Sequence, residues 1–238
     1  MKKIATLDHY AASLLVAESI ADVVRTEKNA CLGLATGGSM ELVYANLVEF
    51  FEKDGVSFGR VTTVNLDEYI GLPPSHLQSY RHYMNSHFFD LVDIDKANTC
   101  IPPGMEAPEA ALAAFQKFLG SHPRDFQLLG VGANGHIGFN EPGAFFEANA
   151  HIVTLDECTR KDNSRFFGSI DEVPRQAITM GIGDIMKASK IMLLVRGDNK
   201  KEALRELISH DRVDPRVPCT VLKLHSDVTV VYPEKLAP

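Results

Sequence analysis

Cysteine, basic charge and long apolar runs are all scarce in this chain of 238 residues. Its four cysteines, Cys31, Cys100, Cys158 and Cys219, show neither metal-ligand nor CxxC spacing, which favours reduced thiols in a cytoplasmic protein. No apolar stretch approaches the roughly 20 residues that a membrane-spanning helix needs. The N-terminal stretch MKKIATLDHYAASLL is interrupted by polar residues, unlike a signal peptide. The sequence therefore predicts a soluble, cytoplasmic protein without a membrane partner.

Basic residues are outnumbered by acidic ones, 24 to 31, so the formal net charge is −7 at pH 7. Such a chain repels nucleic acid, and no Lys/Arg run overcomes that repulsion locally. A hydrophobic fraction of 45% excludes a disordered chain. No repeat and no low-complexity linker divides the sequence, so we expect one domain over residues 1–238.

Helix and strand patterns alternate along the chain. Apolar residues recur at helical spacing in residues 9–28, 42–51, 79–89, 108–119 and 199–209. Short apolar or β-branched runs predict strands at residues 31–35, 61–66, 126–131, 190–196 and 227–232. Ser39 is a suitable N-cap for the second helix. The pattern predicts the α/β class: an open, mostly parallel sheet with helices on both faces, in the Rossmann-like, doubly wound arrangement.

Polar residues follow four of the predicted strands at the point where each strand ends. They occupy residues 36–39, 67–68, 134–136 and 197–200. Because the carboxyl ends of parallel strands meet at one edge of an open sheet, where ligands bind, we expect these segments to converge on one cleft.

Two of the four segments carry candidate acid/base groups. A carboxylate at Asp67, beside apolar neighbours, could serve as a base, and the alternative is a solvated pair or a helix cap. His136, with Glu141 five residues later, offers an imidazole oriented by a carboxylate, and the alternative is a capping histidine in a turn. Metal binding is less supported, because no third ligand has suitable spacing. Gly130, Gly132 and Gly135 match G-x-G-x-x-G, but the residues that follow oppose a helix, so we reject a dinucleotide site.

The other candidates concern an anion. The glycines of residues 36–39 could turn backbone N–H groups towards an anion, although many such turns bind nothing. Arg165, between polar and aromatic residues, and Lys200, at the start of a predicted helix, suit a phosphate clamp. Each of these two cations could instead be an exposed surface charge.

Taken together, these segments resemble the glucosamine-6-phosphate deaminase (isomerising) family. The likeness runs in family order along nearly the whole chain, through residues 34–39, 63–72, 79–81, 130–142, 159–160, 163–167, 177–183 and 224–229. Its most specific segments are Asp-Glu-Tyr at 67–69 and Gly-His-Ile-Gly-Phe-Asn-Glu-Pro at 135–142.

The resemblance implies conversion of glucosamine 6-phosphate and water to fructose 6-phosphate and ammonia, in amino-sugar catabolism, with no cofactor and no metal. By motif position, Asp67 is the base that moves a proton from C2 to C1 of the opened sugar. His136 carries the proton that opens the ring, with Glu141 holding it. Many relatives have Asp at the position of Asn134. The Asn134 amide can orient His136, but it cannot act as a base. The implied phosphate ligands are Gly37, Gly38, Ser39, Arg165 and Lys200.

Further expectations concern partners. Longer relatives bind the activator N-acetylglucosamine 6-phosphate with basic residues after the Asn-Glu-Pro turn, and residues 145–154 contain no Lys or Arg. We therefore expect no activation by that compound, and the choice between a monomer and a homo-oligomer stays open. Two alternatives are a 6-phosphogluconolactonase-like hydrolase, which would use His136 without a base at Asp67, and a sugar-phosphate sensor that has lost the acid/base set.

Overall fold

A parallel sheet forms the centre of the protein in the computed structural model, which describes residues 1–164 and 167–238. Within these residues seven strands follow the order β1-β10-β9-β6-β2-β3-β5, and every neighbouring pair is parallel. The predicted fold class is confirmed. The strands are β1 (Lys2–Thr6), β2 (Cys31–Leu34), β3 (Thr62–Asn65), β5 (Thr99–Cys100), β6 (Phe126–Leu129), β9 (Lys190–Leu194) and β10 (Val228–Pro233).

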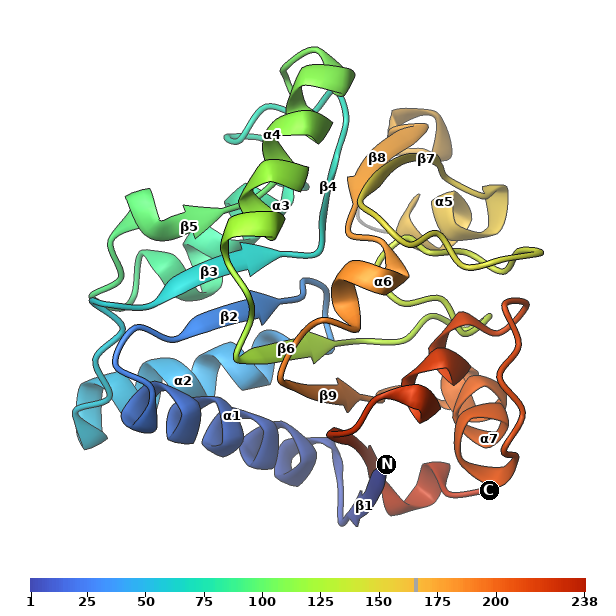
Figure 1. Ribbon diagram of the computed structural model, residues 1–238, viewed down its shortest axis with the longest axis horizontal. Helices are drawn as coiled ribbons and strands as arrows, with labels where there is room; N and C mark the ends of the chain where they lie inside the picture. Colours follow the sequence, from blue (N-terminus) through green and yellow to red (C-terminus); the bar gives the residue numbers. More distant parts are fainter. Residues whose placement is uncertain (165–166) are drawn as a thin grey trace.

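Helices cover both faces of this sheet. The chain passes through α1 (His9–Thr26) and α2 (Glu41–Asp54) while it moves from β1 towards β3, and it returns through α4 (Pro108–Ser121) and α6 (Ile182–Ile185). Because crossovers between parallel strands are right-handed, reversing the direction places the second set on the opposite face. In Figure 1, α1 and α2 lie together, and α4 and α6 lie apart from them, with α4 running across β3.

Local sequence explains the helix ends and corrects one prediction. Asp8 caps α1, because its Oδ1 accepts the N–H of Ala11 at 2.8 Å. The sequence predicts Ser39 as the N-cap of α2, and this is wrong. Met40 takes that position, without a side-chain cap. The Met40 N–H donates to the Gly37 carbonyl at 2.9 Å, so residues 38–40 form a separate turn before the helix.

A second, smaller sheet was not predicted. It is antiparallel, in the order β4-β8-β7, with β4 (Asp67–Tyr69), β7 (His151–Thr154) and β8 (Gln176–Thr179). Asp67 therefore opens a strand and is paired with Thr179, whereas the sequence placed it in a turn after β3. Between β7 and β8 the chain forms α5 (Glu157–Asn163).

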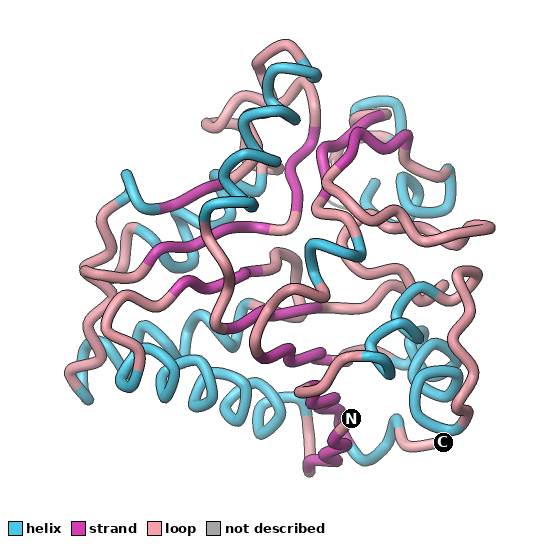
Figure 2. The backbone as a smooth tube through the Cα atoms, in the orientation of Figure 1, coloured by secondary structure: helices cyan, strands magenta, loops and turns pink. Residues whose placement is uncertain are grey.

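Three further elements bear on the site and its surroundings. These are α3 (Tyr80–Met84), the π-helical turn η1 (Asn85–Phe89) and α7 (Lys201–Ser209). The arrowheads of β2, β3, β6 and β9 point to the same side of the molecule (Figure 1), and loops fill much of that side (Figure 2). None of the helices in the described parts of the chain is long and apolar enough to cross a membrane.

Candidate active site

A cavity of about 650 Å³ opens at the carboxyl ends of four neighbouring strands, β9, β6, β2 and β3. Each strand is followed by residues that line it: Gly37 after β2, Asp67 after β3, His136 after β6 and Lys200 after β9. The four polar segments therefore meet at one cavity, as the strand topology predicts. Of the other predicted site residues, Gly38 and Ser39 also line the cavity. Arg165 lies outside the described residues.

Asp67 is buried at the wall of this cavity, with 7% of its surface exposed. Gly138 has φ +58°, and a Cβ there would lie 3.5 Å from Asp67 Oδ2 and 3.0 Å from Thr179 Oγ1. The loop after β6 thus packs closely against the carboxylate. Burial, and then the charge of Glu68, raise the pKa of Asp67 to about 8. A carboxylic acid with this pKa can accept and return a proton near neutral pH.

His136 is held by the backbone of its own loop. A Cβ on Gly132 would come within 2.4 Å of the imidazole Nδ1, and the Gly132 N–H donates to the His136 carbonyl at 2.9 Å. Only glycine leaves room for the ring at this position. Residues 130–136 form turns with no helix, so the glycines shape a histidine loop and the G-x-G-x-x-G match is accidental.

Glu141 lies behind His136 and is fixed by three neighbours. Its Oε2 lies 3.3 Å from His136 Nδ1, an ion-pair distance without hydrogen-bond alignment, and accepts Asn134 Nδ2 at 2.8 Å. Its Oε1 accepts the Thr159 hydroxyl at 2.5 Å. Burial alone would raise the pKa of Glu141, but the His136 ring and then Thr159 and Asn134 outweigh burial and lower the pKa. The carboxylate is therefore kept ionised next to the imidazole.

Asn134 also contacts the backbone of the histidine loop. Its Oδ1 accepts the His136 N–H at 3.2 Å, while its Nδ2 bonds to Glu141. The amide thus links the histidine to the carboxylate. Among the side chains that the structure describes, which leave out those of residues 158, 162, 165 and 166, no three His, Cys, Asp or Glu groups gather where they could hold a metal ion.

The glycine-rich turn after β2 is held through its carbonyl groups. Gly37 has φ +105°, a conformation that favours glycine. Tyr83 Oη donates to the Gly37 carbonyl at 2.9 Å, and Arg196 Nη1 donates to the Gly38 carbonyl. Because C=O and N–H point in opposite directions in a trans peptide, each bond also fixes the N–H of the next residue. Such fixed N–H groups suit an anion.

Sequence reasoning missed several side chains of this site. Arg196 lines the cavity beside Lys200, and its position as the last residue before Gly197 at the end of β9 was the signal available. Tyr80, Phe139 and Asn163 line it as well, with Tyr80 stacked on Phe139 at 6.2 Å between ring centres. These residues carry no local pattern, since their role depends on contacts between distant segments.

Helix α5 is attached to the site at two points. Thr159 bonds to Glu141, and Asn163 Nδ2 donates to Tyr69 Oη at 2.9 Å. Tyr69 in turn packs on Tyr80 and Phe139, with ring centres 5.0 and 5.6 Å apart. This small apolar cluster joins β4, α3 and the histidine loop.

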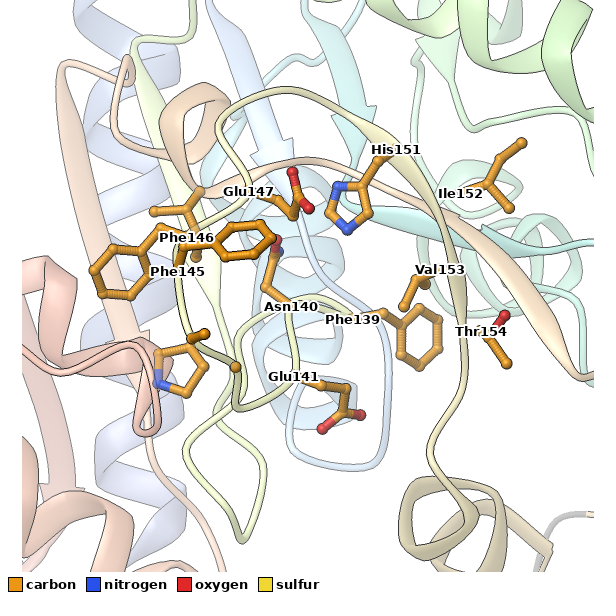
Figure 3. A pocket seen from close by; sticks show the side chains of 14 residues that line it. Phe139, Asn140, Glu141, Phe145, Phe146, Glu147, His151, Ile152, Val153 and Thr154 are labelled. Carbon is orange, nitrogen blue, oxygen red and sulfur yellow. The ribbon is translucent and has the colours of Figure 1, made fainter.

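A second cavity, of about 320 Å³, lies beside the first and shares Phe139 with it. Its polar lining includes Glu141, Glu147 and His151, and none of the described residues that line it is Lys or Arg. The carboxylate of Glu141 is turned away from Glu147 and His151 (Figure 3). This lining does not suit an anion.

Comparison with known proteins supports the assignment of the fold and the family. Residues 5–231 match the family model of glucosamine-6-phosphate isomerases/6-phosphogluconolactonase. The chain belongs to this family. A glucosamine-6-phosphate deaminase of Clostridium perfringens (strain 13 / Type A) is 41% identical over 100% of this chain and 98% of its own. One of Bacillus velezensis is 44% identical, with 98% and 97% covered.

Solved structures of the family agree with the fold. A monomeric glucosamine-6-phosphate deaminase has a TM-score of 0.96 and 42% identity, covering 99% of this chain and 98% of its own. The 6-phosphogluconolactonase from Trypanosoma cruzi has a TM-score of 0.75 and 16% identity, covering 99% and 95%. At that identity the second likeness concerns the fold alone.

Proposed function

We propose that this protein is a glucosamine-6-phosphate deaminase, which converts glucosamine 6-phosphate and water to fructose 6-phosphate and ammonia in cytoplasmic amino-sugar catabolism. Residues 1–238 act as one catalytic domain. The observation that carries the proposal is that the Asp67 carboxylate, on β4, and the His136 imidazole, in the loop after β6, line the same cavity. Full-length relatives of that name at 41–44% identity support the choice of substrate.

Ring opening is the first step. His136 takes the proton of the C1 hydroxyl and delivers it to the ring oxygen, so that the C1–O5 bond breaks and an aldehyde forms. Glu141, ionised beside Nδ1, stabilises the imidazolium while it carries the proton. Asn134 keeps the two groups together and takes no proton itself.

Isomerisation and deamination follow at the neighbouring carbons. Asp67 removes the C2 proton while the aldehyde oxygen O1 takes up a proton, which gives an enolamine. Asp67 then returns its proton to C1 and the amino group gives up a proton, which leaves an imine at C2 and a hydroxyl at C1. Addition of water to that imine and loss of ammonia give the ketose. One carboxylate serves both carbons because they are adjacent and the side chain is short and buried.

The phosphate anchors the substrate at the glycine-rich turn. The N–H groups of Gly38 and Ser39 and the Lys200 side chain surround this part of the cavity, and Arg196 adds a positive charge. Arg165 completes the predicted phosphate set from outside the described residues. Binding energy from this remote group positions C1 and C2 at Asp67.

A coupled assay for ammonia and fructose 6-phosphate tests the proposal. Wild-type protein should form both products in equal amounts from glucosamine 6-phosphate. Asp67→Asn should lower kcat by about 10³-fold, because the base is lost, with little change in KM. Glu147→Gln, a carboxylate of the second cavity, is the matched control and should retain activity. Hydrolysis of 6-phosphogluconolactone without release of ammonia from the amino sugar would contradict the proposal.

A further inference from the structure

Glu68 is a buried carboxylate that the proposed reaction does not use. It stands between Asp67 and Tyr69 on β4, and only 3% of its surface is exposed. Successive side chains of a strand point to opposite faces, so Glu68 faces away from the cavity that Asp67 lines. A charged side chain buried at such a position requires polar partners.

Its partners are three backbone N–H groups. Oε1 accepts the N–H of Tyr69 at 2.9 Å and that of Tyr80 at 3.0 Å, and Oε2 accepts the N–H of Arg81 at 3.0 Å. The first N–H groups of a helix have no partner within the helix, and here the carboxylate supplies one. Glu68 thereby ties the strand of Asp67 to the first turn of α3, which carries the cavity residue Tyr80.

The charge of Glu68 is only weakly compensated. The Arg81 guanidinium turns to β5 instead, where Nη1 donates to Thr99 Oγ1 at 2.7 Å and Nη2 to the Thr99 carbonyl at 3.1 Å. Within the described part of the chain, Glu68 has no ion pair. Burial raises the pKa of Glu68 to about 7, and the three N–H groups and Arg81 limit that rise.

Other charged or titratable groups also face Asp67. The strand β8 opposite contributes none, since its paired residues are Thr179, Ile178 and Ala177. The remaining walls of the cavity contribute Tyr80 from α3, His136 from the histidine loop, Glu41 from α2, and Arg196 and Lys200 after β9. The adjacent Glu68 charge raises the pKa of Asp67, second to burial.

We propose that Glu68 is a positioning residue for the Asp67 base: its carboxylate fixes β4 to α3, and its negative charge opposes the ionisation of Asp67. The inference rests on the proposed function, because it assigns Glu68 a part in proton transfer at that site. Two properties of Glu68 can therefore be tested separately. One is the clamp, by which we mean the bonds of its carboxylate to the three backbone N–H groups, and the other is its negative charge.

The charge is tested with Glu68→Gln. The profile of kcat/KM against pH should rise as Asp67 ionises, and in this variant the rise should move to lower pH by about one unit, because a like charge is gone. Asp184→Asn is the control: Asp184 is also buried and accepts the Ala150 N–H at 2.7 Å, away from the cavity, although it pairs with Lys187 as well. The control should lower the melting temperature and leave the profile in place. An unmoved profile in Glu68→Gln, or an equal shift in the control, would overturn the inference.

The clamp is tested with Glu68→Asp, which keeps the charge but is too short to reach all three N–H groups. Here kcat should fall about tenfold, since small displacements of a catalytic group are costly, while the pH profile stays at its wild-type position. Wild-type kcat in this variant would overturn the positioning role even if Glu68→Gln did not fold. Failure of the proposed function is recognised separately, by full activity of Asp67→Asn or by absence of ammonia release from the wild type.

Discussion

At the residue scale, the site separates two acid/base groups by their surroundings. Asp67 is buried with a neighbouring negative charge, which raises its pKa to about 8. Glu141 is surrounded by the His136 ring and two hydrogen-bond donors, which lower its pKa. Asp67 at the cavity wall therefore favours its protonated form near neutral pH, whereas Glu141 behind His136 stays ionised.

The raised pKa of Asp67 predicts a pH-dependent cost to stability. The unfolded chain ionises this carboxyl near pH 4, whereas the folded protein keeps the proton until about pH 8, so its stability falls as pH rises between these values. Asp67→Asn removes that cost. Its free energy of unfolding should exceed that of the wild type by about 1–2 kcal/mol at pH 9, and the difference should vanish towards pH 4. Urea unfolding across this range measures it, and the exposed Asp211→Asn is the control. A gain independent of pH would contradict the prediction.

At the element scale, the loop after β6 is shaped by close contacts to glycine. Gly132 lies under the His136 ring, and Gly138 lies against Asp67 and Thr179. The proline and glycines after His136 ruled out a helix from the sequence alone, but which ring lies on which glycine depends on tertiary contacts. Sequence patterns therefore located this loop without showing how it is built.

Gly132→Ala should displace the imidazole, because the added methyl would occupy the space of the ring. We expect kcat/KM to fall about 100-fold, in line with the cost of moving a catalytic group by about 1 Å. Gly120→Ala, in an exposed part of α4 with no atom near the new Cβ, is the matched control and should keep full activity. Steady-state kinetics of the two variants decide the point; equal activity would mean that the ring does not need the Gly132 contact.

At the scale of the whole molecule, the parallel sheet and the meeting point of four polar segments were predictable. Strands such as Lys190–Leu194 are almost continuously apolar, and polar residues begin where they end. The small antiparallel sheet was not predictable, since its strands have three or four residues and β7 is only partly buried. Tyr80 enters the site through the arrangement of elements, which no local pattern records, whereas for Arg196 the position just before Gly197 was a signal.

The second cavity predicts the response to an effector. Carboxylates and a histidine line it, and no Lys or Arg is among its described lining residues, so a phosphorylated sugar finds no cation there. Addition of N-acetylglucosamine 6-phosphate should leave the dependence of rate on substrate concentration unchanged. The measurement is the initial rate at subsaturating substrate with and without that compound, and a clear increase would contradict the prediction.

The pairing of β1 with β10 has a consequence for how the protein is made. Lys2 lies beside Thr229 and Thr6 beside Pro233, and β10 is the strand that connects β1 to the rest of the sheet. During translation, the first strand emerges from the ribosome long before its partner exists. The sheet is therefore completed after synthesis of β10, when the two extremes of the described fold come together.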